Sequence, residues 1–230
     1  MNLRTWYDAY WSEKGDLVDR HRLRQFLEHI ADGEQVLVLD SGNGVLGHML
    51  LERGYRVFAT DLSGVACRMS RDKGLLAVQV DLDAGGLPFA DESFDIVVSD
   101  SGLEHRFFVE PVLDEVVRVL RPRGQFLLLL PNIAHWWVRW QLLRGHFPVR
   151  RNTPTDFTHL RHFTLADTRR MLEERGLRVV ATDGSASLWV WQMYPVYFRW
   201  PVIRDVYTRL ARGWPSLFAR DFIIDARKSP

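Results

Sequence analysis

A glycine-containing turn and a later acidic residue follow the first two apolar runs of the chain. Gly42 and Gly44 come directly after the apolar run 36–39, and a helical pattern follows them. Glycines at such a turn let the backbone approach a ligand, and the start of the next helix offers free amide groups. Asp61 lies 17 residues after Gly44, at the end of the second apolar run. At that interval a carboxylate can accept both hydroxyls of a ribose, so the pattern indicates a nucleoside ligand.

Histidines supply further candidate chemistry. His105 follows the fourth apolar run, and His159 and His162 are spaced so that they could share one helix face. No carboxylate or cysteine motif accompanies that pair, so the sequence predicts no metal site. For His135, as for His159 and His162, packing or helix capping stands beside contact with the substrate as an equal alternative.

Positive charge is concentrated in one stretch of the chain. No acidic residue occurs from Val116 through Thr155, and this stretch carries seven arginines. A GC-rich genome would explain why the chain has 27 arginines and only 3 lysines, but it would not remove the acids. The stretch favours phosphate, carboxylate or anionic lipid. The side chains expected to meet an anionic acceptor, or the surface that presents it, are Arg139, Arg144, Arg150 and Arg151.

Tryptophans lie beside two of these arginines. Trp136, Trp137 and Trp140 lie in one short helical stretch alongside Arg139 and Arg144. Such rings commonly complete a core. Tryptophan with arginine on a short amphipathic helix is also how a peripheral enzyme rests on a bilayer, and it could cover a lipid-linked or aromatic acceptor.

The elements that must position these residues are strands and helices in alternation. Near-continuous apolar runs of strand length, with helical patterns between them, are typical of a parallel sheet covered on both faces. In the last run Phe222, Ile224 and Ala226 share one face, which predicts a strand near an edge that could be antiparallel. The sequence therefore predicts a three-layer, doubly wound α/β fold with strands at 35–39, 56–60, 77–80, 94–99, 125–130, 177–182 and 221–227.

Helix signals punctuate the chain between these runs. An amphipathic pattern over 23–30 predicts a helix before the first strand. Ser63 is expected to cap a second helix and Pro111 to open a third. Residues 164–167 form a capping box for a helix that stops at Gly176.

Composition favours one soluble domain over 1–230, with a helical cap at 1–34, a core at 35–182, and substrate or lid insertions at 132–163 and 185–218. Cys67 is the only cysteine, and the polar start of the chain lacks the apolar stretch of a signal peptide. We therefore expect a cytoplasmic protein, with peripheral contact at the inner face of the membrane as an addition.

An ordered series of short motifs runs along the chain. The motifs are VLVLDSGNG (36–44), RVFATDLS (56–63), VDLDAGGLPFADESFDIVVS (80–99), GLEH (102–105), EVVRVLRPRGQFLLLLPN (115–132) and HLRHFT (159–164). This series resembles the class I S-adenosylmethionine (SAM) dependent methyltransferases, especially the families with Leu-Pro-Phe and Ser-Phe-Asp motifs. The last motif is similar to a segment of methyltransferases encoded beside sugar-polymer enzymes. Dinucleotide-binding dehydrogenases do not carry this series.

The resemblance assigns roles to the glycine turn and to the second strand. It implies that Gly42 and Gly44 line the methionine and ribose of SAM, that Asp61 holds the ribose hydroxyls, and that Leu62 flanks the adenine. The fold implied is the Rossmann-like methyltransferase sheet, with SAM at the carboxyl ends of the first, second and fourth strands.

Further roles fall on the segments after the third and fourth strands. The acid near the adenine amino group is Asp81 when counted from the third strand, or Asp83 when counted back from Leu-Pro-Phe. Ser99 would border the methyl group that is transferred. The candidate catalytic side chains are His105 and His159, either of which could take the acceptor proton.

The first motif departs from the family pattern at two positions. Aligned without gaps, Val38 stands at the usual acid and Asp40 at the first of three glycines. An alignment shifted by two residues places Asp40 at the position of the usual acid, but it places Leu46 at the position of the third glycine. We favour the ungapped alignment because it keeps the ten-residue interval from Gly44 to Gly54. Asp40 then either accepts the methionine ammonium through charge-assisted hydrogen bonds or weakens cofactor binding.

The implied activity is methyl transfer from SAM, without a metal, to oxygen or nitrogen of a small molecule, a sugar or a lipid-linked glycan. S-adenosylhomocysteine (SAH) is the other product. A catalytically impaired binding or regulatory protein with the same fold is an alternative. A nucleic-acid methyltransferase ranks below both, because the basic stretch is rich in tryptophan and lacks a recognised RNA-binding module.

Overall fold

The computed structural model describes residues 2–15, 18–150, 153–185 and 200–230. Within these residues the strands are β1 (Gln35–Leu39), β2 (Arg56–Asp61), β3 (Leu76–Gln79), β4 (Phe94–Asp100), β5 (Leu120–Pro131), β6 (Leu177–Ser185) and β7 (Asp221–Lys228). The α-helices are α1 (Leu3–Lys14), α2 (Arg20–Phe26), α3 (Val45–Leu51), α4 (Gly64–Asp72), α5 (Val109–Val119), α6 (Trp136–Leu143), α7 (Leu165–Glu173), α8 (Pro201–Gly213) and α9 (Pro215–Phe218). Two 3₁₀ turns are η1 (Leu27–His29) and η2 (Leu103–His105).

In the described parts of the chain, seven strands form one sheet in the order β3-β2-β1-β4-β5-β7-β6. The strands β1 to β5 are parallel, and β7 is antiparallel to both of its neighbours, β5 and β6. The predicted doubly wound α/β fold is confirmed, with the antiparallel last strand one place from the edge. The strand order reverses between β1 and β4, and α/β proteins bind ligands in the crevice at this point, beyond the carboxyl ends of the strands.

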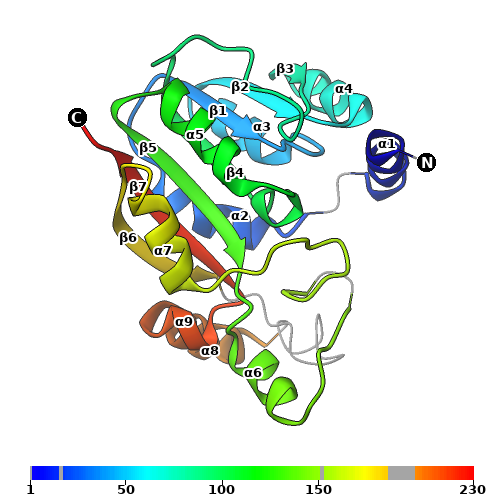
Figure 1. The fold of residues 1–230 in the computed structure, drawn as a ribbon, viewed down its shortest axis with the longest axis vertical. Coiled ribbons are helices and arrows are strands. Elements are labelled where there is room, and N and C mark those ends of the chain that lie inside the picture. Colours follow the sequence, from blue (N-terminus) through cyan, green and yellow to red (C-terminus); the bar gives the residue numbers. More distant parts are fainter. Residues whose placement is uncertain (1, 16–17, 151–152, 186–199) are drawn as a thin grey trace.

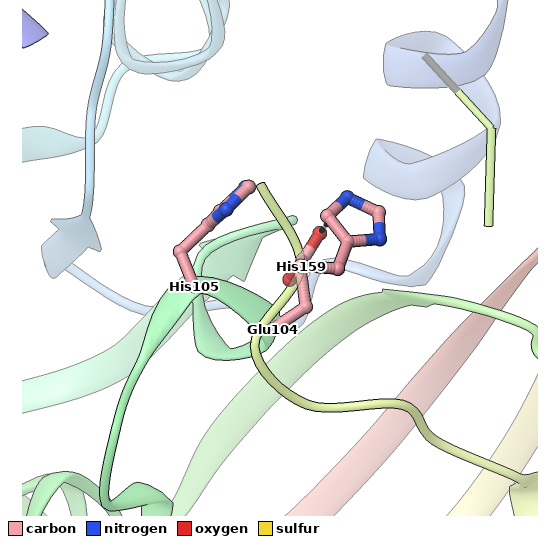
Figure 2. Close-up of side chains that lie close together, drawn as sticks. All are labelled: Glu104, His105 and His159. Atoms are coloured by element: carbon pink, nitrogen blue, oxygen red, sulfur yellow. Dashed lines mark ion pairs between the residues drawn. The ribbon is translucent and has the colours of Figure 1, made fainter. Parts of the chain in front are cut away.

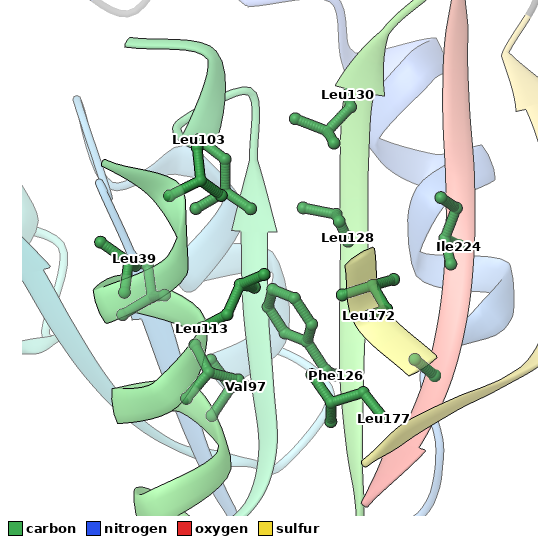
Figure 3. Packing of buried hydrophobic residues seen from close by; sticks show 14 of the residues in the cluster. Leu39, Val97, Leu103, Leu113, Phe126, Leu128, Leu130, Leu172, Leu177 and Ile224 are labelled. Carbon is green, nitrogen blue, oxygen red and sulfur yellow. The ribbon is translucent and has the colours of Figure 1, made fainter. Parts of the chain in front are cut away.

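Helices cover both faces of the sheet (Figure 1). On one face, Phe126 and Leu128 of β5 pack with Leu113 of α5 and Leu172 of α7 (Figure 3). Leu127, between them in β5, belongs to the cluster on the other face, which includes residues of α2, α3 and α4. Because alternate side chains of a strand point to opposite faces, burial on both faces explains the continuous apolar runs. The sheet is thus a rigid base for the loops at its carboxyl edge.

The helix signals are mostly confirmed. Ser63 accepts a hydrogen bond from the amide of Ala66 and caps α4, and Thr164 caps α7 in the same way. The expectation that Pro111 opens a helix is wrong by two residues, since α5 begins at Val109. The reason is that the first turn of a helix leaves its amides without helical partners, so a proline is tolerated further into it.

The segment after β5 leaves the sheet and returns to it. It contains α6, and its two ends meet where Asn132 and Phe163 form an isolated β-bridge. This bridge places both ends of the segment at the carboxyl end of β5. The second expected insertion, 185–218, contributes α8 and α9, whereas its residues 186–199 lie outside the described parts of the chain. Among the helices described, none is both long and apolar enough to cross a bilayer.

Candidate active site

The glycine turn follows β1 as the sequence predicts. Asp40, Gly42 and Gly44 all have positive φ angles, of 50°, 54° and 76°. This left-handed region favours glycine, because a side chain there is strained. Asp40 thus occupies a backbone position suited to a glycine, as the ungapped alignment of the first motif requires.

Asp61 ties the turn after β1 to the turn after β2. One oxygen of its carboxylate accepts the amide of Gly42 and the other accepts the amide of Ser63, both at 2.8 Å. The side chain is buried, and burial together with the charge of Asp40 raises the pKa of Asp61 to about 6. The carboxylate therefore lies between the two loops that the resemblance assigns to the cofactor.

Helix α1 lies over this glycine turn, which sequence reasoning did not find. A Cβ atom on Gly42 would come within 2.5 Å of the Trp11 ring, so only glycine fits beneath that ring. Asp8 accepts hydrogen bonds from the Ser63 hydroxyl at 2.6 Å and from the Val65 amide at 3.1 Å. These contacts hold α1 against the start of α4. The spacing of aromatic residues in α1 signals a partly buried helix face but not the surface that this face covers.

A buried arginine joins three of the loops. Arg106, just after η2, donates one hydrogen bond to Asp40 and another to Asp83, the second at 3.3 Å. Its side chain is only 6% exposed. Asp40 therefore already has a cationic partner within the chain. The sequence shows Arg106 only as part of GLEHR, and nothing local reveals ion pairs across 66 and 23 residues of chain.

Three polar atoms at the carboxyl edge are buried without a hydrogen-bond partner among the described residues. They are the second carboxylate oxygen of Asp40, the hydroxyl of Thr60 and the hydroxyl of Ser99, which belong to the ends of β1, β2 and β4. Leaving such atoms unpaired costs free energy. Together with the glycine turn and Asp61, they fit a polar, nucleoside-containing ligand such as SAM.

The two alternatives for the adenine acid lie in the turn after β3. Asp81 accepts the amide of Asp83 at 3.1 Å, and the carboxylate of Asp83 is the one that pairs with Arg106. Leu62, expected to flank the adenine, is buried directly after Asp61. Both acids stay candidates, although the ion pair leaves the carboxylate of Asp83 less available to a ligand than that of Asp81.

His135 has a structural role that favours its capping alternative. Its Nδ1 accepts the amide of Trp137 at the start of α6, and its Nε2 lies 2.7 Å from the Tyr207 hydroxyl. Burial lowers the pKa of His135 to about 4, so the ring is neutral at pH 7. Both ring nitrogens have protein partners.

The capping role of His135 predicts a small loss of stability on truncation. We expect His135→Ala to lower the free energy of unfolding by about 1 kcal/mol, which is typical for a lost helix cap. His135→Asn, which keeps a capping side chain, should lose less. Urea denaturation of both variants tests this, and an unchanged His135→Ala midpoint would contradict it.

Two other histidines come together with an acid that the sequence analysis did not single out. His105 and Glu104, both in η2, lie beside His159 from the loop before α7 (Figure 2). His159 and His162 do not share a helix face, as their spacing would have allowed, because 153–163 forms turns held in part by backbone hydrogen bonds to other segments. His162 is exposed and packs edge-on against Phe147.

The arginines of the basic stretch differ in their surroundings. Arg139 donates to the carbonyls of Ala134, at 2.6 Å, and Ser216, at 3.4 Å. Arg144 lies over the ring of Trp140. Arg150 is exposed and lines a hollow that also contains His135, Trp137, Val138, Thr153, Pro154 and Arg220. Arg151 lies outside the described residues.

Comparison with known proteins gives both a family and a fold. Residues 20–199 match the family described as methionine biosynthesis protein MetW. A protein of Mycolicibacterium smegmatis named as a probable SAM-dependent methyltransferase is 29% identical over 77% of this chain and 63% of its own length. The ubiquinone/menaquinone biosynthesis C-methyltransferase UbiE of Rubrivivax gelatinosus is 30% identical over 52% of this chain and 49% of its own length. The chain thus spans about half to two thirds of these curated relatives.

Among solved structures, a chain from the complex of the Haloferax volcanii Trm112 methyltransferase activator with a methyltransferase superposes with a TM-score of 0.70. The match covers 97% of this chain and 98% of that one, at 21% sequence identity. At this identity the likeness shows the fold alone, which is that of the class I methyltransferases.

Proposed function

Because the chain belongs to the MetW family and has the class I methyltransferase fold, we propose that it transfers a methyl group from SAM to a small acceptor. The observation that carries this proposal is the Asp61 carboxylate, buried between the glycine turn after β1 and the start of α4. These loops meet beside the point where the strand order reverses, where this class of fold binds its ligand.

SAM supplies an activated methyl group on its sulfonium when it is bound. The residues of this chain bind and orient. Asp61 holds the ribose hydroxyls, the turn at Gly42 and Gly44 lets the backbone approach the methionine and ribose, and Ser99 borders the acceptor space. Helix α1 excludes water from the glycine turn, where Trp11 already covers Gly42. Alignment of the acceptor with the methyl group is the main catalytic contribution.

The acceptor is proposed to be anionic and to approach from the basic stretch. Arg150 and Arg220 line the same hollow beyond β5, and arginine suits a phosphate or a carboxylate. Arg150 is the more available of the two, because Arg220 also pairs with Asp221 at 3.2 Å. Oxygen and nitrogen are the acceptor atoms expected from the sequence, in a small molecule, a sugar or a lipid-linked glycan. The UbiE relative adds carbon, since its name describes a C-methyltransferase.

A binding or regulatory protein of the same fold is the second candidate. The ion pair between Asp40 and Arg106 favours it, because it occupies the place of a family glycine that normally comes close to the ligand. Incubation with methyl-labelled SAM and fractionated metabolites separates the two candidates. Labelled product and SAH are expected for the enzyme, whereas a melting temperature raised by SAM without any labelled product would identify the binding protein.

The anionic acceptor predicts a kinetic effect at Arg150. Charge reversal in Arg150→Glu, alone or with Arg151→Glu, should raise the acceptor KM at least about tenfold, which corresponds to about 1.4 kcal/mol. The dissociation constant of SAM should not change, because Arg150 lies beyond β5, away from the glycine turn. Arg170→Glu, on the exposed face of α7, is the matched control. An acceptor KM that is equal in all variants would show that the basic stretch is only a solvated surface.

A further inference from the structure

Glu104 is a buried carboxylate that lacks a partner. Its side chain is 1% exposed, and neither carboxylate oxygen has a hydrogen-bond partner among the described residues. The Nε2 atom of His159 lies 4.0 Å from Oε1, beyond hydrogen-bond distance. A carboxylate in such a place is costly unless a cation compensates it.

Each of the two histidines beside Glu104 has one ring nitrogen next to a backbone carbonyl. Nδ1 of His105 lies 3.0 Å from the Thr158 carbonyl, and Nδ1 of His159 lies 3.2 Å from the Pro154 carbonyl. A carbonyl can only accept, so each Nδ1 carries the proton and each Nε2 keeps its lone pair. A backbone carbonyl on the far nitrogen is the usual support of a histidine that binds a metal.

The backbone holds these three side chains together. The amides of Leu160 and Arg161 both donate to the Glu104 carbonyl, at 2.8 Å and 3.0 Å. This pins the loop that carries His159 against η2. Each of the three side chains contributes one ligand atom to a group whose atoms all lie within 4.8 Å of one another (Figure 2).

We propose that Glu104, His105 and His159 bind a divalent transition-metal ion of the Zn²⁺ type. Two imidazoles and one carboxylate form a donor set that Zn²⁺ uses in catalytic sites, where a fourth position stays open for water or substrate. Mg²⁺ and Ca²⁺ prefer oxygen ligands and fit this set poorly. Tetrahedral ligands at zinc distances stand about 3.4 Å apart, so the side chains draw together when the ion binds.

The position of this site suggests that the ion activates the acceptor, an inference that rests on the proposed methyl transfer. The 3₁₀ turn η2 begins three residues after β4, at the edge where the acceptor is expected, and the Tyr7 ring of α1 contacts His105 edge-on. An acceptor hydroxyl in the open position would lose its proton to solvent more easily, because the ion lowers its pKa. The oxygen then forms the new bond to the methyl carbon as the carbon–sulfur bond breaks, giving a methyl ether and SAH. The preferred acceptor is thus one with a metal-binding hydroxyl.

The test is metal binding by chelator-treated protein, followed with Co²⁺ by visible absorption and with Zn²⁺ by calorimetry. Wild type should bind one ion with the intense Co²⁺ bands of a four-coordinate site, and Zn²⁺ should raise its melting temperature. Glu104→Gln and His159→Gln should each weaken Zn²⁺ binding at least about 100-fold, beyond the effect of losing an outer-shell partner. His146→Gln, an exposed histidine outside the cluster, should bind Zn²⁺ like wild type.

The stability of the metal-free protein distinguishes metal binding by Glu104 from a purely structural role of this residue. That role predicts that metal-free Glu104→Gln is less stable than wild type. The metal site predicts that it is at least as stable, because the replaced carboxyl group is buried without a hydrogen-bond partner among the described residues, and that only the gain from Zn²⁺ disappears. Absence of saturable one-to-one binding in wild type, or unchanged affinity in Glu104→Gln, would overturn the proposal. SAM affinity is measured separately on metal-free protein. If SAM binds and Zn²⁺ does not, the proposed metal site is rejected and the proposed methyltransferase function is retained. If Zn²⁺ binds and SAM does not, the methyltransferase function is rejected and the metal site is retained.

Discussion

Asp61→Asn should weaken SAM binding at least about 100-fold while leaving the fold intact. The variant keeps the shape of the side chain but removes the charge that accepts the two ribose hydroxyls, and charged hydrogen bonds contribute about 1.5–3 kcal/mol each. One of the two backbone hydrogen bonds, from Gly42 or Ser63, is lost as well, because the amide group has only one acceptor. Isothermal calorimetry with SAM and SAH measures the change directly.

The raised pKa of Asp61 adds a pH dependence to this result. Because its pKa is about 6, the carboxyl group is largely protonated below that pH and charged above it. SAM affinity of the wild type should therefore increase as pH rises through about 6, and Asp61→Asn should lack that increase. Asp72→Asn, an exposed acid at the end of α4, is the control that should behave like wild type. Equal affinity of Asp61→Asn and wild type would reject the assignment of Asp61.

Arg106→Met should destabilise the protein by about 3–5 kcal/mol. The substitution leaves the Asp40 carboxylate without a cation in a partly buried site near Asp61, and removing one member of a buried ion pair has a cost of this size. Methionine keeps much of the volume of the arginine stem, so the loss of charge dominates. Urea denaturation at pH 7 gives the free energy of unfolding.

The double variant Asp40→Gly with Arg106→Met separates the ion pair from simple packing. Glycine suits the φ angle of 50° at residue 40, and the double change removes both charges together. The remaining acid, Asp83, is 25% exposed and can be solvated. The double variant should therefore recover most of the stability that Arg106→Met loses. If the two variants were equally unstable, the pair would not be the reason for aspartate at this glycine position.

The central strands β1, β4 and β5 were predictable because they are buried on both faces and so form nearly unbroken apolar runs. Even the direction of β7 was signalled, by the alternation of Phe222, Ile224 and Ala226. Helix starts were less predictable: Pro111 fits any position of a first turn, so it marks the turn but not its first residue. The turns around His159 were missed because their hydrogen bonds to η2 connect residues far apart in the sequence.

The candidate site also has a part that the sequence predicts and a part that it does not. Gly42, Gly44 and Asp61 follow strands directly, so the strand pattern already places them at one edge of the sheet. The partners of Asp40 and Asp83 depend on Arg106, whose side chain reaches across the edge from another loop. The contact of Trp11 with Gly42 likewise depends on how α1 docks, and docking of a separate helix has no local signal in the sequence.

The central claim is that SAM binds between the loops that follow β1, β2 and β4, and a crystal structure with SAH tests it most directly. The account predicts the ribose hydroxyls of SAH on the carboxylate of Asp61 and its homocysteine beside the turn at Gly42 and Gly44. Adenine should lie against Leu62, and α1 should remain over the bound ligand. SAH bound elsewhere on the protein, or no SAH at a saturating concentration, would contradict the account.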